Sequence, residues 1–132
     1  MRNFFSRLTT VTAAPASPIF KVGDQAERRA EIFLVAHGLQ LQARNFRCRH
    51  GEIDLIMRDG PMLVFIEVRL RQRSDYGGAA ESIHFPKQRR IVLAAQYYLA
   101  SMQPLPPCRF DAVLLDSLDG KDIEWIRDAF SP

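Results

Sequence analysis

Two acidic residues in the middle of the chain interrupt segments that are otherwise apolar. Asp54 lies in the run 52–57 and Glu67 lies in the run 62–68, and both runs are rich in aliphatic residues. Carboxylates are seldom buried without a partner, so each one needs a structural or a chemical explanation. Two carboxylates on adjacent strands can share a Mg²⁺ ion, which would activate a water molecule and stabilise charge on a phosphate under attack.

The spacing of the two runs predicts a β-hairpin that brings these acids together. Asp59-Gly60 between apolar runs is a strong hairpin signal. With those two residues as the turn, Asp54 becomes a diagonal neighbour of Glu67, about 7–8 Å away at Cα, and Glu52 lies directly opposite Glu67. By the alternation of a strand, one face carries Glu52, Asp54, Glu67 and Arg69.

The acids could instead belong to an ordinary ion-pair network with Arg69, Arg71 or Arg109. Lys87 favours the metal interpretation. It lies four residues before Ile91, at the head of a predicted buried helix stripe, so its stem should point toward the sheet. A cation at a helix N-terminus is disfavoured unless an anion is nearby. The alternative is a solvated surface lysine.

Two further charged groups each allow two interpretations. Glu27 and Glu31 lie one turn apart on a predicted helix, where pairing with Arg28 or other arginines is the simplest account. At the exit of a predicted strand, three arginines alternate with other residues. They suit either a phosphate backbone or a solvated edge strand, and they are Arg69, Arg71 and Arg73.

The elements that must position these side chains alternate between helix and strand. Apolar residues at helical spacing predict helices over residues 23–37 and 86–102. Strands are expected at residues 39–46, 52–57, 62–68, 109–116 and 123–126, with a loop over 71–84. The strand–helix–strand order over residues 62–116 has the length for a crossover that pairs two strands in parallel. The predicted fold is α/β, a mixed central sheet flanked by helices.

Composition sets the class of protein. The chain has 132 residues, of which 47% are hydrophobic and 25% charged, and this excludes a wholly disordered chain. We expect residues 1–21 to form a flexible tail and residues 22–132 a single domain. No apolar run reaches the ~18–20 residues of a membrane span. Two isolated cysteines, Cys48 and Cys108, favour reduced thiols in the cytoplasm.

The net charge of +3 hides an uneven distribution. Residues 1–109 hold 16 basic and 9 acidic side chains, whereas residues 110–132 hold 2 and 6. The body of the chain is therefore more basic than the total indicates, which permits a polyanionic partner.

Several motifs together resemble the YraN family of bacterial proteins. They are GEIDLI at 51–56, VFIEVR at 64–69, YGGAA at 76–80, Lys87 and RFD at 109–111, and the resemblance covers about residues 22–126. That family is similar in fold to archaeal Holliday junction resolvases and to the restriction-endonuclease-like superfamily. In that superfamily, an acid on one strand and an E-x-K unit on the next bind Mg²⁺ and position the attacking water.

The resemblance implies a metal-dependent DNA endonuclease or resolvase-like enzyme that hydrolyses phosphodiester bonds. Asp54 and Glu67 would bind Mg²⁺ or Mn²⁺, and Glu27 would supply a third acid from its helix. Arg69 would occupy the place of the superfamily's lysine, and Lys87 would assist at the phosphate. The implied partner is nucleic acid, above all DNA, including branched DNA. A homodimer is one assembly that the related resolvases form.

Arg69 departs from the superfamily pattern. An arginine can hold a phosphate but stays protonated, so it cannot act as a base. A catalytically silent nucleic-acid-binding module is therefore the alternative function, and an adaptor whose acids form only structural pairs is a third.

Overall fold

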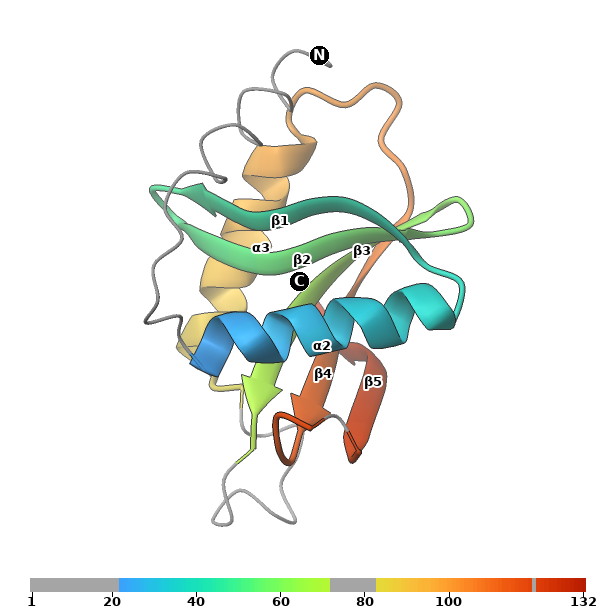
Figure 1. Ribbon diagram of the computed structural model, residues 1–132. Coiled ribbons are helices and arrows are strands. Elements are labelled where there is room, and N and C mark those ends of the chain that lie inside the picture. Colours follow the sequence, from blue (N-terminus) through green and yellow to red (C-terminus); the bar gives the residue numbers. More distant parts are fainter. Residues whose placement is uncertain (1–21, 72–82, 120) are drawn as a thin grey trace, which may run out of the picture.

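The computed structural model describes residues 22–71, 83–119 and 121–132. The described residues form a five-stranded sheet with a helix on each face (Figure 1). In chain order the elements are α2 (Val22–Ala36), β1 (Gln40–Cys48), β2 (Gly51–Asp59), β3 (Met62–Leu70), α3 (Phe85–Leu99), β4 (Cys108–Leu115) and β5 (Ile123–Phe130). The predicted tail, most of the predicted loop and Arg73 lie outside the described residues.

The strands lie in the sheet in chain order, from β1 to β5. Neighbouring strands are antiparallel except β3 and β4, which are parallel because α3 lies between them in the chain. The prediction of a mixed α/β sheet with a crossover between these two strands is confirmed. Neither helix of the described residues is long and apolar enough to cross a membrane.

The core has two halves, one on each face of the sheet. Alternate residues of β3 divide between them, with Val64 and Ile66 packing on the α2 side and Leu63 and Phe65 on the α3 side. Each helix contributes the apolar stripe expected from its spacing. These stripes are Ala26, Ala30 and Leu34 in α2, and Ile91, Ala94 and Ala95 in α3. Glu67, also on β3, is thus carried on the side that faces α3.

The ends of α3 and β5 differ most from the predicted ones. The stripe of α3 predicts a helix to residue 102, but the helix ends at Leu99 and Met102 follows in a turn, its N–H bonded to the Leu99 carbonyl. The chain tightens at this end, because the Ala100 N–H bonds the Tyr97 carbonyl three residues back and so leaves the α-helical hydrogen-bond pattern. The last strand is longer than predicted, since pairing with β4 continues to Phe130.

The predicted register of the hairpin formed by β2 and β3 is wrong by two residues, because the turn lies one residue further along the chain. Gly60 and Pro61 form the turn, and Asp59 pairs with Met62. Gly60 has a φ of 61°, a left-handed conformation that glycine adopts without steric cost. A turn over Asp59 and Gly60 would have placed that demand on Asp59 as well.

The shifted register also changes the partner of Glu52. Its predicted position opposite Glu67 is wrong, because the pairing of Leu55 with Ile66 places Asp54, and not Glu52, at the position that faces Glu67. On its other side Glu52 lies opposite Arg47 of β1 and forms a 3.0 Å ion pair with it. The repulsion expected between two opposed carboxylates is therefore absent from this pair of positions.

A buried carboxylate joins β4 to β5. Asp111 is fully buried and accepts hydrogen bonds from Arg109 Nε at 2.9 and 3.1 Å, from Trp125 Nε1 at 2.9 Å and from the Asp128 N–H at 2.9 Å. Arg109 also donates to Asp59 at 3.1 Å. Asp111 therefore anchors the end of the sheet, in addition to the local ion pair that its sequence position suggests.

We predict that Asp111→Ala lowers the free energy of unfolding by about 3–5 kcal/mol, because it leaves the Arg109 Nε–H, an indole N–H and a backbone N–H without their acceptor. Urea denaturation measures the change. Asp122→Ala removes an exposed acid and should stay within about 0.5 kcal/mol of the wild type. Equal stability of the two variants would show that Asp111 is not an anchor.

Candidate active site

The ladder between β2 and β3 stops just before Asp54. The last paired residue of β2 on this side is Leu55. Ile53 and Ile56 both pack on the α3 side although they are three residues apart, so the regular alternation breaks between them. Asp54 Oδ2 accepts a hydrogen bond of 2.8 Å from the backbone N–H of Val68. A side-chain oxygen thus replaces a strand carbonyl, and the two strands part at this point.

A matching irregularity lies in β1, at Asn45. Its two neighbours pair with Leu55 and Ile53, so Asn45 faces Asp54 across the strand pair. Its φ is 50°, in the left-handed region that asparagine tolerates better than most residues. The Asn45 side chain hydrogen-bonds Glu27. Sequence analysis missed this residue, and the only signal was an asparagine inside a strand, where it is uncommon.

Three different elements bring a carboxyl group to the opening between β2 and β3. Glu27 comes from α2, Asp54 from β2 and Glu67 from β3. Asp54 shares side-chain hydrogen bonds with both glutamates. Because an ionised carboxylate can only accept, a hydrogen bond between two carboxyl groups requires a proton on one of them. The predicted association of Asp54 with Glu67 is therefore present, and Glu27 joins it.

Burial raises the pKa of all three acids. Burial and then the charge of Asp54 raise the pKa of Glu27 to about 8 and that of Glu67 to about 7. Burial also raises the pKa of Asp54, against the opposing effect of the Val68 N–H. Near neutral pH the cluster therefore retains protons, which a bound cation could displace.

Lys87 reaches the same cluster from α3. Its Nζ lies 3.4 Å from Glu67 Oε2, and its side chain is 34% exposed whereas that of Glu67 is 4% exposed. The prediction that this lysine points toward the sheet is confirmed, and the alternative of a fully solvated side chain is wrong. Lys87 lowers the pKa of Glu67, although burial outweighs it.

Two of the three arginines offered as alternative partners for the acids lie in other networks. Arg71 pairs with Asp116 at 2.8 Å and with Glu124 at 2.9 Å, at the β4–β5 end of the sheet. Arg109 pairs with Asp59 and Asp111. The structure thus offers no support for an account in which these two neutralise Asp54 and Glu67.

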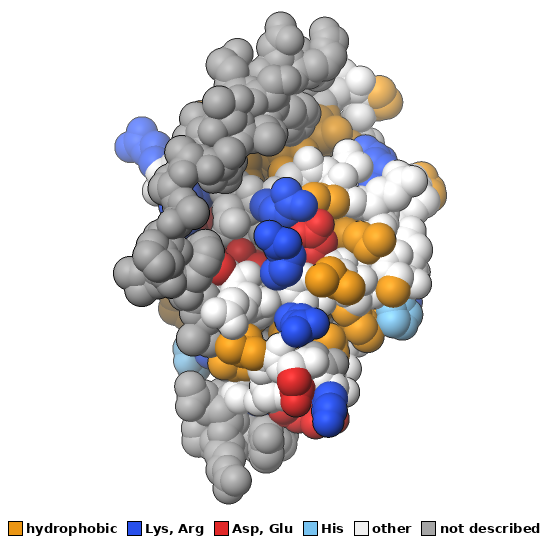
Figure 2. All heavy atoms as spheres, in the orientation of Figure 1, with side chains coloured by type: hydrophobic (Ala, Val, Ile, Leu, Met, Phe, Trp, Pro, Cys, Tyr) orange, Lys and Arg blue, Asp and Glu red, His pale blue; other side chains and the backbone are white. Residues whose placement is uncertain are grey.

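Of the remaining predicted residues, some lie at the cluster and others form ion pairs elsewhere. Arg69 is half-buried, and the alternation of β3 places it on the same side as Glu67. Glu31 forms a 2.8 Å ion pair with Arg44, as the simple account of the helix acids predicts, whereas Glu27 joins the cluster. Figure 2 shows basic and acidic side chains lying together near the middle of the face that α2 covers.

The donor set suits a hard divalent cation. Mg²⁺ prefers carboxylate oxygens and commonly keeps several waters while binding one or two protein carboxylates and a substrate phosphate. Burial and mutual repulsion raise the pKa of the acids, and the positive charge of such a cation would offset both effects. Among the described residues no group of three or more His, Cys, Asp or Glu side chains forms a preassembled metal cage. Asp54 and Glu67 therefore fit a hydrated ion better than one enclosed by protein.

The chain has many relatives that share most of its length. Residues 26–115 match a family described as uncharacterised protein family UPF0102. A UPF0102 protein of Nitrosospira multiformis is 60% identical over 82% of this chain and 91% of its own length. One of Dechloromonas aromatica is 58% identical over 83% and 88%. One of Cupriavidus metallidurans is 51% identical over 89% and 87%.

The raised pKa of Glu27 predicts how stability changes with pH. Between its usual 4.5 and about 8, the native state binds more protons than the unfolded chain. The free energy of unfolding should therefore fall as the pH rises through this range. Glu27→Gln removes the titrating group, so we expect a smaller fall in urea denaturation with chelator present.

Glu31→Gln is the matched control, because Glu31 lies one turn along α2 and is paired with Arg44. It should keep the wild-type dependence on pH. The same slope in the wild type and in Glu27→Gln would contradict the raised pKa.

Proposed function

The chain belongs to the protein family UPF0102, the YraN family that its motifs resemble, and we propose that it is a metal-dependent DNA endonuclease. The observation that carries the proposal is the meeting of Asp54, Glu67 and Lys87 in the opening between β2 and β3. An acid on one strand and an E-x-R unit on the next follow the restriction-endonuclease-like pattern with one substitution. That fold, a cytoplasmic location and a nucleic-acid partner are parts of the same proposal.

Asp54 and Glu67 are the proposed ligands of Mg²⁺ or Mn²⁺. When bound, such an ion polarises a phosphate and lowers the pKa of a water molecule. The hydrogen bond from Val68 fixes the Asp54 carboxylate, and Lys87 holds that of Glu67. Both ligands are thus oriented before a substrate arrives, which is the form of preorganisation that catalysis requires.

The other members of the cluster have separate roles in the proposal. Glu27 is the acid outside the ligand pair, and its pKa of about 8 lies in the range suited to proton transfer near neutral pH. Lys87 is placed to neutralise a phosphate oxygen beside Glu67. Arg69 can contact a phosphate but cannot take a proton from water.

A nucleic-acid-binding module without activity is the second candidate, and Arg69 is the observation that favours it. In this module the carboxylates would remain as a structural remnant of the nuclease site, and the basic residues alone would hold the phosphates. The two candidates predict different effects of removing the Glu67 carboxylate. In the enzyme, DNA cleavage would be lost. In the module, there would be no cleavage to lose, and DNA binding would stay unchanged.

We predict Mg²⁺- or Mn²⁺-dependent cleavage of DNA that chelator abolishes. Linear, nicked, flapped and four-way-junction substrates are incubated with the full chain. Glu67→Gln and Asp54→Asn should each slow cleavage by about 100-fold or more, because the several kcal/mol that a metal contributes would be lost. Asp122→Asn changes an exposed acid just before β5, outside the cluster, and should cleave like the wild type.

Two results would contradict this function. Salt-sensitive DNA binding that persists in Glu67→Gln, with no cleavage under either metal, would reject the enzyme and support the binding module. Binding that does not weaken with salt would remove nucleic acid as the partner, since phosphate contacts release counterions.

A further inference from the structure

A groove of about 400 Å³ adjoins the carboxylate cluster on the side of α3. Its walls are the turn between β1 and β2 and the first half of α3. Lys87 belongs to both places, because it lines the groove and also contacts Glu67. A ligand lying in the groove would therefore lead directly to the proposed metal ligands.

The charge of this groove is strongly positive. Its walls carry four basic side chains, Arg47, Arg49, Lys87 and Arg90, and one acidic side chain, Glu52. Glu52 is already paired with Arg47. Within the described part of the chain, Arg49 and Arg90 have no acidic partner, and both are exposed. Positive charges gathered in a groove raise the local concentration of anions.

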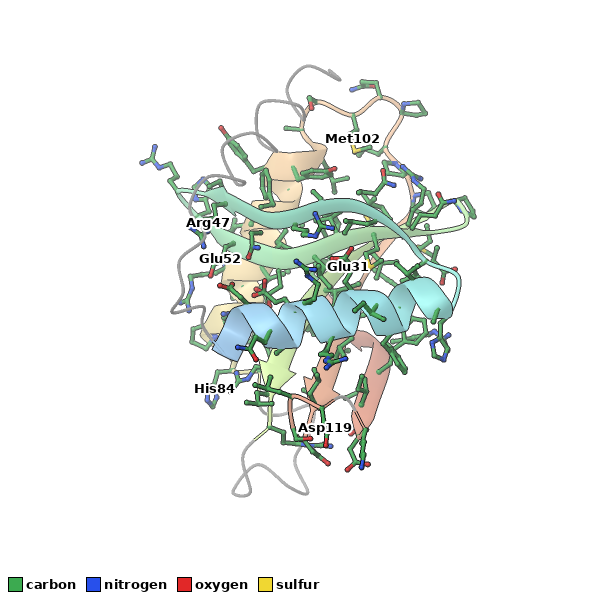
Figure 3. The ribbon with its side chains drawn as sticks, viewed as in Figure 1. Glu31, Arg47, Glu52, His84, Met102 and Asp119 are labelled. Carbon is green, nitrogen blue, oxygen red and sulfur yellow. The ribbon has the colours of Figure 1, made fainter. Side chains whose placement is uncertain are left out.

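The two walls are held together by a close backbone contact. A Cβ on Gly51 would lie 2.9 Å from the carbonyl oxygen of Arg90, so only glycine allows the turn to approach α3 this closely. This contact fixes Arg49 on the turn relative to Arg90 on the helix. Figure 3 shows Arg47 and Glu52 side by side at this end of β1 and β2.

The predicted basic run offers a weaker candidate for contacting phosphates. Arg71 is occupied by Asp116 and Glu124, and Arg73 lies outside the described residues. The groove, by contrast, carries two arginines without acidic partners next to the cluster. Arg69, the remaining member of the run, lies on the same side of β3 as Glu67, and the groove adds Arg49 and Arg90 to it.

We propose that the groove formed by Arg47, Arg49, Lys87 and Arg90 holds the phosphodiester backbone of a nucleic-acid strand and leads it to Asp54 and Glu67. This inference rests on the proposed function, and it names the surface that binds the substrate. Cations from two elements suit a chain of phosphates better than a single one. Because phosphate contacts carry no base information, binding by this surface is independent of sequence.

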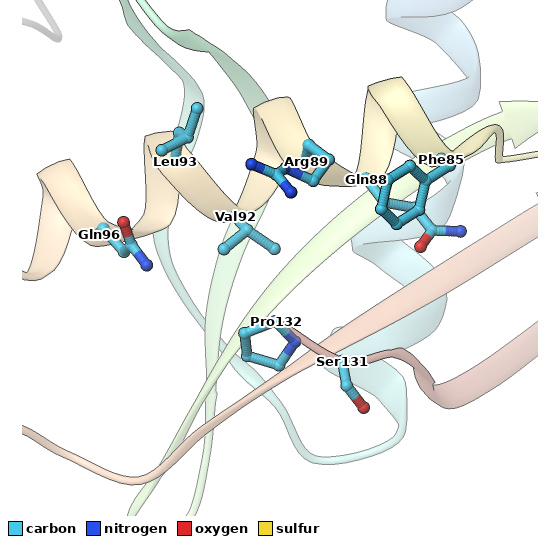
Figure 4. A pocket seen from close by; sticks show the side chains of 8 residues that line it. All are labelled: Phe85, Gln88, Arg89, Val92, Leu93, Gln96, Ser131 and Pro132. Carbon is cyan, nitrogen blue, oxygen red and sulfur yellow. The ribbon is translucent and has the colours of Figure 1, made fainter.

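The neighbouring residue on α3 provides a matched control. Arg89 lies in a different groove, between α3 and the C-terminal residues Ser131 and Pro132 (Figure 4). Its guanidinium lies 5.9 Å from the centre of the Phe85 ring. Arg89→Ala and Arg90→Ala therefore remove the same charge from the same helix but from different grooves.

Fluorescence anisotropy of labelled DNA, with chelator present, tests the groove. Arg90→Ala and Arg49→Ala should each weaken binding about tenfold, equally for unrelated sequences, and each should reduce the slope of log affinity against log salt by about 1. Arg89→Ala should leave both quantities at their wild-type values. Inorganic phosphate should compete only weakly with DNA.

The outcomes separate this inference from the proposed function. Weaker binding by Arg90→Ala and Arg49→Ala in a protein that never cleaves would support the groove and reject the enzyme. Metal-dependent cleavage with no difference among Arg89→Ala, Arg90→Ala and Arg49→Ala would keep the enzyme and overturn the groove. Displacement of DNA by inorganic phosphate at a concentration equal to that of the protein would also overturn the groove proposal, since the site would then bind a small anion. Circular dichroism of each variant checks that it folds.

Discussion

The hydrogen bond from the Val68 N–H to the Asp54 carboxylate determines the geometry around which the molecule is arranged. It ends the ladder between β2 and β3, so a polar opening forms in the middle of a sheet that is otherwise closed. Because the helices lie on opposite faces, α2 can bring Glu27 to this opening and α3 can bring Lys87. Had the ladder continued, the sheet would have separated these two side chains. The break in register thus allows residues from both layers to form one cluster.

This arrangement has an electrostatic cost that the fold alone does not explain. Burial raises the pKa of Glu27 and Glu67, and within the described residues the cluster forms an ion pair with Lys87 alone, although the chain is rich in arginine. Asp111 shows that the same protein can satisfy a buried acid fully, with a guanidinium, an indole and a backbone N–H. Natural sequences tend to tolerate such local costs at functional sites. The contrast between these two environments is a physical reason to regard Asp54 and Glu67 as chemical rather than structural residues.

Much of this architecture is predictable from sequence, because apolar spacing indicates both helices and the five strands, and the strand–helix–strand order indicates the parallel pairing of β3 with β4. The exact pairing is less accessible. Asp59-Gly60 and Gly60-Pro61 are both turn signals, and the pairing of Asp59 with Met62 in the folded hairpin decides between them. Asn45 illustrates a second limit, since one asparagine does not reveal a left-handed residue inside a strand. Likewise, Glu27 could be assigned to the acids only through the family resemblance, and the partners of Arg71 and Arg109 depend on long-range contacts between strands.

The central claim is that the carboxylates at the parting of β2 and β3 exchange protons for a divalent cation. Isothermal titration of Mn²⁺ into the full chain near neutral pH, in two buffers of different ionisation enthalpy, measures binding and proton release together. The account predicts saturable binding with release of about one proton per ion, since Glu27 and Glu67 have pKa values of about 8 and about 7, and loss of binding in Glu67→Gln. Absence of binding, or binding that is unchanged in Glu67→Gln, would contradict it.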